Sequence, residues 1–396
     1  MKQLTIVGVG VGPESVTPSA RRAIERAQVL FGAPRLLQEW NAVQKTAYPH
    51  YTAAKITPFI NNSDADRFAL LVSGDVGFYS AAASLCRECD DIEVRMEPGI
   101  SSLHYFFARL GRPWQDAATV SCHGRQANLV DTVRRSAATF VLTGGNIPAL
   151  GDALCRAGFS GLAVTVGQRL GMEDESITRH TAAELTSLSA DPLTVLLIDN
   201  PSPDASCPTG IDDAAFIRGQ VPMTKSAVRA VTMSKLRLQP GAVCCDVGAG
   251  TGSVTVEMAL SAWRGHVYAI DKAPAAIDLI KQNCAAFHIG NVTPILGDAL
   301  EQFAALPPMD AVFIGGSSGE MEALIAAAVA KNSAVRIVVN AIALETVQQA
   351  MAAFSAQGIE PEIVQLSWAE TRAVSRVHML TAQNPIFILS GGGAHE

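Results

Sequence analysis

The chain has 396 residues, 48% of them apolar, and its 37 acidic and 30 basic residues give a formal net charge of −7. This length suits two domains better than one. The negative charge offers no general attraction to a phosphate backbone or an anionic membrane, so we expect no nucleic-acid or membrane partner. Apolar runs end well short of the ~20 residues that a membrane helix needs.

The eight cysteines show no disulfide framework. Cys86 and Cys89 have the spacing of metal ligands, but no second pair completes a site, so we expect no bound metal. The first twelve residues are typical of a strand that runs into a glycine-rich turn, and not of a secretory signal. Together these features predict a cytoplasmic protein with reduced thiols.

A glycine-rich turn follows the first predicted strand, residues 4–9. Thr17 and Pro18 then supply a helix N-cap and a first helical residue. Pro13 occupies the place of the last glycine in the dinucleotide-binding fingerprint, and the helix begins several residues late. On its own, this turn is as consistent with a structural loop as with a binding loop. Its sequence is Gly8-Val9-Gly10-Val11-Gly12-Pro13.

Three further small-residue loops, 73–79, 97–102 and 142–146, each follow a predicted strand of the first half. Those strands are 68–72, 92–96 and 139–142. Loops at the ends of neighbouring strands converge at one edge of a sheet and leave room for a folded ligand. The basic residues Arg35, His123 and Arg125 are candidate contacts for an anionic substrate, and His123 directly follows another predicted strand, 118–121.

These loops together resemble the tetrapyrrole methylases, whose S-adenosylmethionine is held by such loops between two α/β lobes. The resemblance covers residues 1 to about 200, including Arg169-Leu170-Gly171, and it departs at Val76, where many members have proline. It implies that the cofactor-binding residues of the first half are Gly8, Gly10, Gly12, Pro13, Gly74, Asp75, Ser101, Ser102 and Thr143.

A proline-rich segment divides the chain near its middle, with Pro201, Pro203 and Pro208 directly after the predicted strand 194–198. Proline restricts the backbone and removes hydrogen-bond donors, so this segment is expected to be an extended linker. We therefore predict a first domain at 1–200, a linker at 201–209 and a second domain at 210–396.

Short β-branched runs alternate with alanine-rich helical stretches in both halves, which is typical of α/β domains with mostly parallel strands. The remaining predicted strands are 163–166 in the first half and 243–247, 266–270, 292–296, 311–314, 337–340, 362–366 and 385–389 in the second.

The second half has a stronger motif at a strand-to-helix turn. Its sequence is Asp246-Val247-Gly248-Ala249-Gly250-Thr251-Gly252-Ser253. Glycine allows the sharp turn and a close approach of the backbone to a ligand. Ser253 occupies the third glycine position of the dinucleotide fingerprint. Asp246 favours recognition of the amino group of a methionine-type ligand over binding of pyrophosphate.

Two more acids end the next two predicted strands. Asp271 lies about 20 residues beyond the turn, where a carboxylate can accept both hydroxyls of a ribose. Asp298 is placed to contact an adenine edge, although an acid at such a position is also typical of a helix N-cap. The predicted cofactor-binding residues of the second half are Asp246, Gly248, Ala249, Gly250, Thr251, Gly252, Asp271, Asp298 and Ala299.

The second half resembles a Rossmann-like class I methyltransferase and, more closely, the decarboxylating precorrin methyltransferase domains, over nearly all of 210–393. The segments 216–225, 313–317 and 338–341 carry the closer resemblance. It implies that Thr224 helps to close the cofactor site, whereas Thr224 read alone is a helix N-cap.

The fusion of the two halves resembles the decarboxylating precorrin C5,15-methyltransferases of cobalamin biosynthesis. This implies two S-adenosylmethionine sites, one per domain, methylation of two meso carbons and loss of one acetate carboxyl as carbon dioxide. Methyl transfer from a sulfonium needs little covalent help, so we assign no catalytic residue. The tetrapyrrole is a polyanion, and its candidate contacts in the second half are Lys225, Arg229, Arg372, Arg376 and His378.

Other functions remain open at this stage. An NAD-linked two-domain oxidoreductase explains the glycines and Asp271, but not the missing third glycine in both halves. A nucleic-acid methyltransferase lacks support, because the chain has no basic tract and no Asn-Pro-Pro-aromatic string. A class I methyltransferase with another substrate and a non-enzymatic cofactor sensor also remain. We expect a homo-oligomer, and the pattern does not indicate whether the macrocycle holds cobalt.

Overall fold

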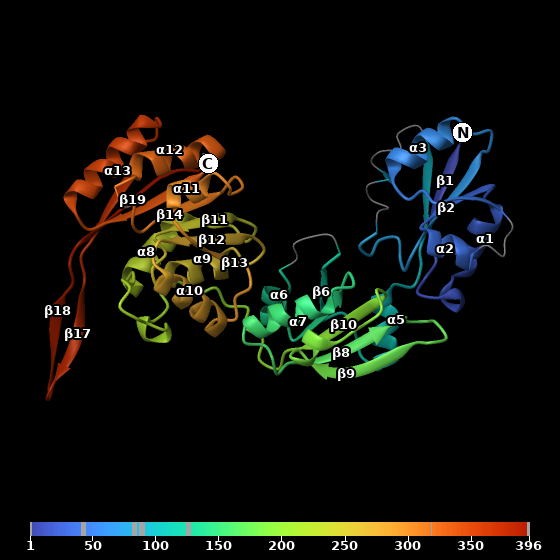
Figure 1. The fold of residues 1–396 in the computed structure, drawn as a ribbon, viewed down its shortest axis with the longest axis horizontal. Coiled ribbons are helices and arrows are strands. Elements are labelled where there is room, and N and C mark those ends of the chain that lie inside the picture. Colours follow the sequence, from blue (N-terminus) through green and yellow to red (C-terminus); the bar gives the residue numbers. More distant parts are fainter. Residues whose placement is uncertain are drawn as a thin grey trace. The chain divides into compact units, whose positions relative to one another are not determined.

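The computed structural model describes residues 2–40, 45–80, 85–86, 92–123, 128–317 and 319–393. The chain forms two compact units (Figure 1). The first comprises 1–127, 137–151 and 161–201, and the second comprises 128–136, 152–160 and 202–396. No helix in the described segments has the length and apolar character needed to cross a bilayer.

The first unit begins with a parallel sheet in the order β3-β2-β4-β1-β5. Helices α1 and α2 pack their apolar residues on one face of it, and α3 packs on the other. Thr17 accepts a hydrogen bond from the Ala20 amide at 3.1 Å, which confirms the predicted N-cap. The elements are β1 (Gln3–Gly8), α1 (Pro18–Arg26), β2 (Val29–Gly32), α2 (Pro34–Glu39), β3 (Thr46–Tyr48), α3 (Ala53–Asn61), β4 (Arg67–Val72) and β5 (Glu93–Glu97).

The second sheet of this unit has the order β6-β7-β10-β8-β9. Only β6 and β7 pair in parallel, because β10 runs antiparallel to β7 and β8, and β9 antiparallel to β8. The prediction of mostly parallel strands is therefore wrong for this sheet, since periodicity does not reveal strand direction. Its elements are α5 (Ser102–Leu110), β6 (Ala118–Ser121), β7 (Ala138–Leu142), β8 (Ala163–Gln168), β9 (Ser176–Thr181) and β10 (Thr194–Asp199).

The second unit contains a sheet in the order β13-β12-β11-β14-β15-β19-β16. The first five of these strands are parallel, and β19 is antiparallel to both neighbours. Helices α8, α9 and α10 cover one face, and α11, α12 and α13 cover the other (Figure 1). The alternation of strands and helices predicted this α/β architecture.

The elements of this sheet and its covering helices have the following bounds. They are α8 (Ser226–Leu236), β11 (Val243–Val247), α9 (Ser253–Ser261), β12 (His266–Asp271), α10 (Pro274–Ala286), β13 (Val292–Leu296), α11 (Ala299–Phe303), β14 (Ala311–Ile314), α12 (Met321–Lys331), β15 (Arg336–Ala341), α13 (Leu344–Ala356), β16 (Glu362–Leu366) and β19 (Ile386–Gly392).

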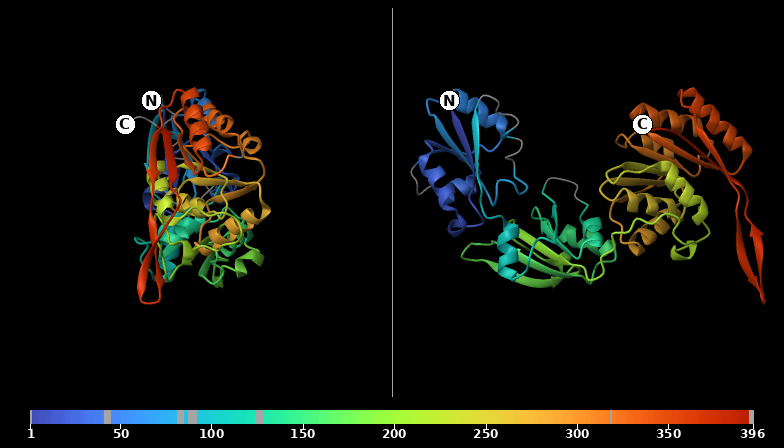
Figure 2. Two further views of the ribbon diagram at one scale, coloured as in Figure 1. Left: turned by 90° about the vertical axis from the view of Figure 1, so that its left-hand side faces the viewer. Right: turned by 180° about the vertical axis from the view of Figure 1, so that it is seen from behind.

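A hairpin of β17 (Ala369–Val374) and β18 (Val377–Ala382) projects from the second unit, away from the seven-stranded sheet (Figures 1 and 2). All residues of both strands are exposed. Sequence patterning did not predict these strands, because no face of the hairpin packs on a core.

Helix α6 (Leu129–Arg135) and the end of α7 (Ile147–Arg156) belong by their contacts to the second unit. The Asn128 side chain donates hydrogen bonds to the carbonyl oxygens of Trp263 and Gly265 at 2.8 and 3.0 Å. The rings of Phe159 and His288 stack with 4.4 Å between their centroids. Apart from these segments, the first unit ends at Pro201 and the second unit begins at Ser202. The predicted domain limits remain a prediction.

Candidate functional site

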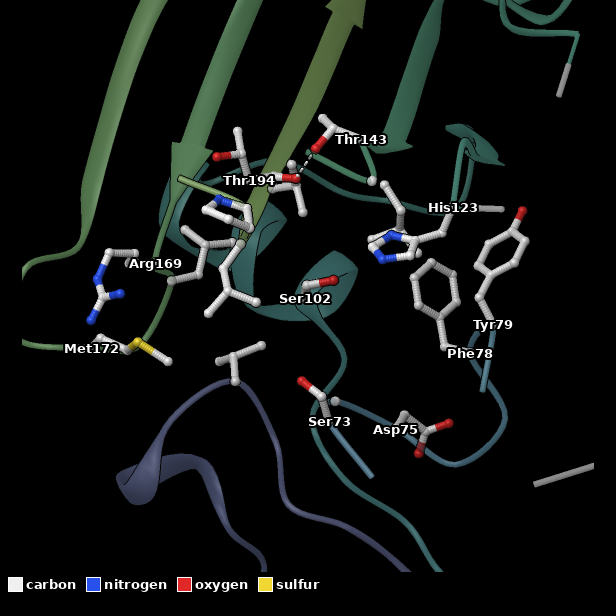
Figure 3. Close-up of a pocket in the computed structure, with 18 of the residues that line it drawn as sticks. Ser73, Asp75, Phe78, Tyr79, Ser102, His123, Thr143, Arg169, Met172 and Thr194 are labelled. Atoms are coloured by element: carbon white, nitrogen blue, oxygen red, sulfur yellow. Dashed lines mark hydrogen bonds between the residues drawn. The ribbon is translucent and has the colours of Figure 1, made fainter. Parts of the chain in front are cut away.

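A cavity of about 330 Å³ lies in the first unit, between loops that follow strands of both sheets (Figure 3). In the figure, Ser73 and Asp75 lie on one side and Thr143 and Thr194 on the other, with Ser102 between them. The structure thus brings together several of the predicted residues. Those that line the cavity are Arg35, Gly74, Asp75, Ser102, His123 and Thr143.

The remaining predicted glycines of the first half, Gly8, Gly10 and Gly12, lie where loops approach each other closely, as does Gly99. Gly10 and Gly74, both with positive φ, exchange backbone hydrogen bonds of 3.1 and 2.8 Å. A Cβ atom on Gly99 would lie 2.1 Å from the Gly74 carbonyl oxygen, and one on Gly12 would lie 2.1 Å from that of Gly171. Only glycine permits such close backbone contacts. Pro13 begins a short 3-10 turn, Pro13–Ser15, directly after Gly12.

Three predicted polar residues are engaged within the protein. The Asp75 carboxylate accepts hydrogen bonds from the amides of Gly77 and Gly99 at 2.8 and 3.1 Å, which joins two loops. Ser101 is fully buried and caps α5 by accepting from the His104 amide. The Thr143 hydroxyl donates to the Thr194 carbonyl at 2.8 Å. These contacts shape the cavity, and the predicted cofactor contacts of these residues remain predictions.

Sequence reasoning did not single out several residues that line the cavity, among them Met172 and the start of β10. Arg169 also lines it, with a positive φ of 48° and ion pairs to Asp174 and Asp191 at 2.5 and 3.4 Å. The signal for Arg169 was its place in the motif 169–171. Arg125 lies outside the described residues, so the structure does not place it.

The glycine motif of the second half forms a tight loop between β11 and α9. Gly248, Gly250 and Gly252 all have positive φ, at 71°, 57° and 77°. A Cβ atom on Gly248 would lie 2.9 Å from the backbone of Gly316, and one on Gly250 would lie 2.7 Å from the Pro222 carbonyl oxygen. The loop is therefore in contact with two of the segments that carry the family resemblance.

Asp271 lies at this loop, as predicted. Its carboxylate accepts hydrogen bonds from the Gly250 and Ala273 amides, both at 2.9 Å. Each carboxylate oxygen has a further lone pair, so the group can accept additional donors from a ligand. The ribose contact remains a prediction.

Asp298 is the N-cap of helix α11, which agrees with the alternative interpretation of this residue. It accepts from the Leu300 amide at 2.9 Å, and Ala299 begins helix α11. The Lys272 ammonium lies 2.6 Å from its other oxygen, and this hydrogen bond lowers the pKa of Asp298. The adenine contact remains a prediction.

Two buried polar atoms near the glycine loop have no hydrogen-bond partner among the described residues. They are Oδ1 of Asp246 and Oγ1 of Thr251. The other oxygen of Asp246 accepts from the Thr255 hydroxyl at 2.5 Å, and burial raises the pKa of Asp246 to about 7. Buried polar groups are rarely left unpaired. This arrangement fits a ligand that supplies hydrogen-bond partners at the loop.

Arg229 was predicted to contact the tetrapyrrole, but the structure places it inside the second unit. Its side chain is fully buried, and its guanidinium contacts Glu257 at 2.8 Å and Asp213 at 3.0 Å. It also donates to the carbonyl oxygens of Thr224 and Ile211. A group enclosed in this way cannot reach a substrate, so Arg229 is a structural residue that holds the segment before α8.

The other basic candidates lie at the surface. Lys225 forms an ion pair with Asp213 at 3.3 Å. Lys225 also occupies the N-cap position of α8, which the alternative interpretation had given to Thr224. Arg372, Arg376 and His378 lie on the projecting hairpin of β17 and β18 (Figure 2). Within one chain, the structure does not bring these three residues to the glycine loop.

Asn283 was missed by sequence reasoning. It is buried on α10, donates to the carbonyl oxygens of Thr251 and Ile217, and accepts from the Ile217 amide at 2.7 Å. It thus connects the glycine loop to the segment that precedes α8. The available signal was helical spacing, which places Asn283 on the same face of α10 as the apolar residues Ala276 and Ile280.

Comparison with known proteins identifies both halves. Residues 3–186 match the family model of Tetrapyrrole (Corrin/Porphyrin) Methylases, and residues 215–391 match that of the Precorrin methyltransferase domain. A precorrin-6Y C(5,15)-methyltransferase [decarboxylating] from Sinorhizobium sp. is 32% identical over 351 residues, which cover 86% of this chain and 84% of that protein.

Two further relatives match only part of the chain. A probable cobalt-precorrin-6B C(15)-methyltransferase (decarboxylating) from Pyrobaculum calidifontis is 41% identical over 184 residues, 46% of this chain and 94% of its own. The crystal structure of a precorrin-6Y C5,15-methyltransferase from Geobacter metallireducens is 35% identical, with a TM-score of 0.45, and covers 47% of this chain and 97% of its own. The similarity to the Sinorhizobium protein runs through both halves, and this chain belongs to the family of decarboxylating precorrin-6Y C5,15-methyltransferases.

Proposed function

We propose that this chain methylates C5 and C15 of a precorrin macrocycle and removes one acetate carboxyl as carbon dioxide. The observation that carries this proposal is the alignment with the Sinorhizobium precorrin-6Y C(5,15)-methyltransferase [decarboxylating], which covers 86% of the chain. The NAD-linked oxidoreductase has no comparable support. Because two glycine-lined regions lie in different units, we propose two S-adenosylmethionine sites, one in each.

In the first unit, the cavity of about 330 Å³ is the proposed cofactor site for one meso methylation. Close backbone contacts at Gly10, Gly74 and Gly99 connect the loops that form the walls of this cavity. His123, Arg35 and Arg169 supply basic groups at the cavity for the carboxylates of the macrocycle.

In the second unit, the glycine loop 248–252 is the proposed cofactor site for the other methylation and for decarboxylation. Asp246 and Thr251 offer buried atoms that lack partners among the described residues, and Asp271 offers free lone pairs at the same loop. Bound S-adenosylmethionine supplies an activated methyl group on a sulfonium, which leaves as a neutral thioether. The residues of the chain orient the ligand and exclude water, and such positioning accounts for about 7–11 kcal/mol of a reaction barrier.

Mass spectrometry of a tetrapyrrole incubation tests the activity. We expect two methyl additions and the loss of one carboxyl, and a product with neither change would overturn the proposal. Running metal-free and cobalt-loaded macrocycles in parallel identifies the substrate form. Calorimetric titration with S-adenosylhomocysteine tests the two sites separately: two ligands per chain support them, and one ligand per chain removes one site.

We also propose that the enzyme is a cytoplasmic homo-oligomer without a nucleic-acid partner. The hairpin of β17 and β18 supports association, because Val377, Met379 and Leu380 are 60%, 55% and 73% exposed there. Light scattering after gel filtration tests this. A monomer at micromolar concentration would contradict the proposed oligomer. An oligomer that survives unchanged in Leu380→Glu would instead show that the hairpin is not its interface.

The proposed domain limits remain 1–200 and 210–396, joined by the linker 201–209. Expression of 1–205 and 209–396 as separate chains tests them by circular dichroism. Because 128–136 and 152–160 group with the second unit, we also expect the two pieces to bind each other when mixed.

A further inference from the structure

A second cavity lies in the first unit, between helix α1 and the parallel sheet. It measures about 310 Å³, and α1, β1, β4 and β5 supply residues to its wall. Gln3 and Arg67, the first residues of β1 and β4, are among them. The glycine-lined cavity lies beyond the last residues of these two strands. The two cavities are thus at opposite ends of β1 and β4.

Four arginines surround this second cavity: Arg22, Arg26, Arg67 and Arg95. Arg22 and Arg26 are one helical turn apart and share a face of α1. On the sheet, Gln3 pairs with Arg67 and Thr5 pairs with Arg95 in parallel register. Alternate residues of a strand share a face, so both strand arginines lie on the face that α1 covers.

The way in which α1 packs explains why the cavity exists. Its apolar residues Ala20 and Ile24 pack on Val7 and Leu71, near the ends of β1 and β4. Near the strand starts, the same face presents Gln3 and Thr5, which are only partly buried. Helix and sheet therefore meet tightly at one end and leave a polar space at the other.

The charges around this space are poorly balanced. Arg95 pairs with Glu93 at 2.7 Å. Within the described segments, no carboxylate forms an ion pair with Arg22, Arg26 or Arg67, and Glu97 is the one acidic residue of the wall. All four arginines are exposed, so the cluster presents positive charge to solvent and is accessible to an anion. The chain as a whole carries a net charge of −7, so this basic cluster is a local exception.

We propose that this cavity is a binding site for a small anion with at least two negative charges, of the oligophosphate or oligocarboxylate class. Guanidinium groups bind both classes through paired hydrogen bonds. The volume lies at the lower end of the ~300–1,000 Å³ range of small-molecule pockets, which suits a ligand much smaller than a tetrapyrrole. This site is separate from both glycine-lined regions, and it does not depend on the proposed methyl transfer.

Isothermal titration of the full chain with inorganic triphosphate and with citrate tests the proposal. We expect one of the two to bind with a stoichiometry of one, and the preferred probe identifies the phosphate or the carboxylate class. Each of Arg22→Gln, Arg26→Gln and Arg67→Gln should weaken binding by about tenfold, and the triple variant by at least about a hundredfold. S-Adenosylhomocysteine binding should not change in the triple variant.

Arg21→Gln is the matched control. It removes the same charge from the same helix, but Arg21 stacks over the Trp40 ring at 5.8 Å and does not line the cavity. Circular dichroism confirms that the variants fold. The proposal is overturned if neither probe binds at about 1 mM, or if Arg21→Gln weakens binding as much as Arg22→Gln does.

Discussion

The two glycine-lined regions of this chain are built in opposite ways, although the same cofactor is proposed for both. In the second unit, one continuous loop at 248–252 contains the glycines, and Asp246 and Asp271 lie at the ends of adjacent strands beside it. In the first unit, the glycines belong to several loops that contact each other through their backbones. A continuous motif is evident in a sequence, whereas a site assembled from separate loops needs a family resemblance to be found.

This contrast extends to the polar groups. At the continuous loop, Asp246 and Thr251 are buried with atoms that have no partner among the described residues, which leaves them available to a ligand. At the assembled site, Asp75 is already hydrogen-bonded to Gly77 and Gly99, and Thr143 is hydrogen-bonded to the first residue of β10. The second unit is therefore expected to depend on individual acids for binding, and the first on the fit of its backbone.

The largest expected effect concerns the support of the continuous loop. Arg229→Ala leaves Glu257 and Asp213 without their buried partner, so we expect the second unit to lose about 3–5 kcal/mol of unfolding free energy. Urea denaturation measures this loss. Lys225→Ala, a control at the exposed partner of Asp213, should cost less than about 1 kcal/mol. Equal effects of the two variants would show that the ion pairs of Arg229 contribute no more to stability than the exposed pair of Lys225 does.

Loss of the carboxylate at the end of β12 should chiefly affect cofactor binding. Asp271→Ala is expected to weaken S-adenosylhomocysteine binding at the second unit by about 1.5–3 kcal/mol, the value of a charged hydrogen bond. Calorimetry should then show one weakened and one unchanged site. Asp278→Ala removes the same charge from an exposed position of α10 and should change neither site. An unchanged affinity in Asp271→Ala would remove the ribose assignment.

The assembled site should be sensitive to backbone fit instead. Gly99→Ala forces a Cβ atom toward the Gly74 carbonyl oxygen, so we expect about 1–3 kcal/mol of destabilisation and loss of binding in the first unit only. Gly161→Ala is the matched control, because its Cβ atom meets nothing within 4 Å. If Gly99→Ala binds two ligands as tightly as the unaltered chain, the contact of the loops is not required for binding.

The smallest expected effect is a dependence on pH at the second site. Burial raises the pKa of Asp246 to about 7, so its carboxyl is protonated in the free protein at lower pH. A ligand ammonium would favour the ionised form. Affinity should therefore fall as the pH is lowered below 7, by up to about tenfold for each pH unit.

The side chain introduced by Asp246→Asn cannot ionise. The difference between the pH profiles of the variant and the unaltered chain therefore separates the ionisation of Asp246 from the titration of the ligand itself. Calorimetry between pH 6 and pH 8 would contradict the assignment if the two proteins showed parallel profiles. The same raised pKa predicts that Asp246 favours folding most at low pH and loses that contribution as the pH rises through 7.

Sequence patterning predicted most strands but missed β2, β3, β9, β17 and β18. Strands β3 and β9 lie at the edges of their sheets, and β17 and β18 pack on no core. Strands in such positions do not need continuous apolar runs, so they lack the usual signal. Strand β2 lies inside its sheet and all four of its residues are buried, so its short apolar run was an available signal.

The α/β class, the glycine loop at 248–252 and the acids near the strand ends could be inferred from the amino-acid sequence alone, because each depends on residues that are neighbours in the chain. The enclosure of Arg229 by Asp213 and Glu257, and the approach of four arginines from a helix and two strands to one cavity, became visible only in the folded chain. Burial and charge balance depend on residues that are distant in the chain, and only the packed fold brings those residues together.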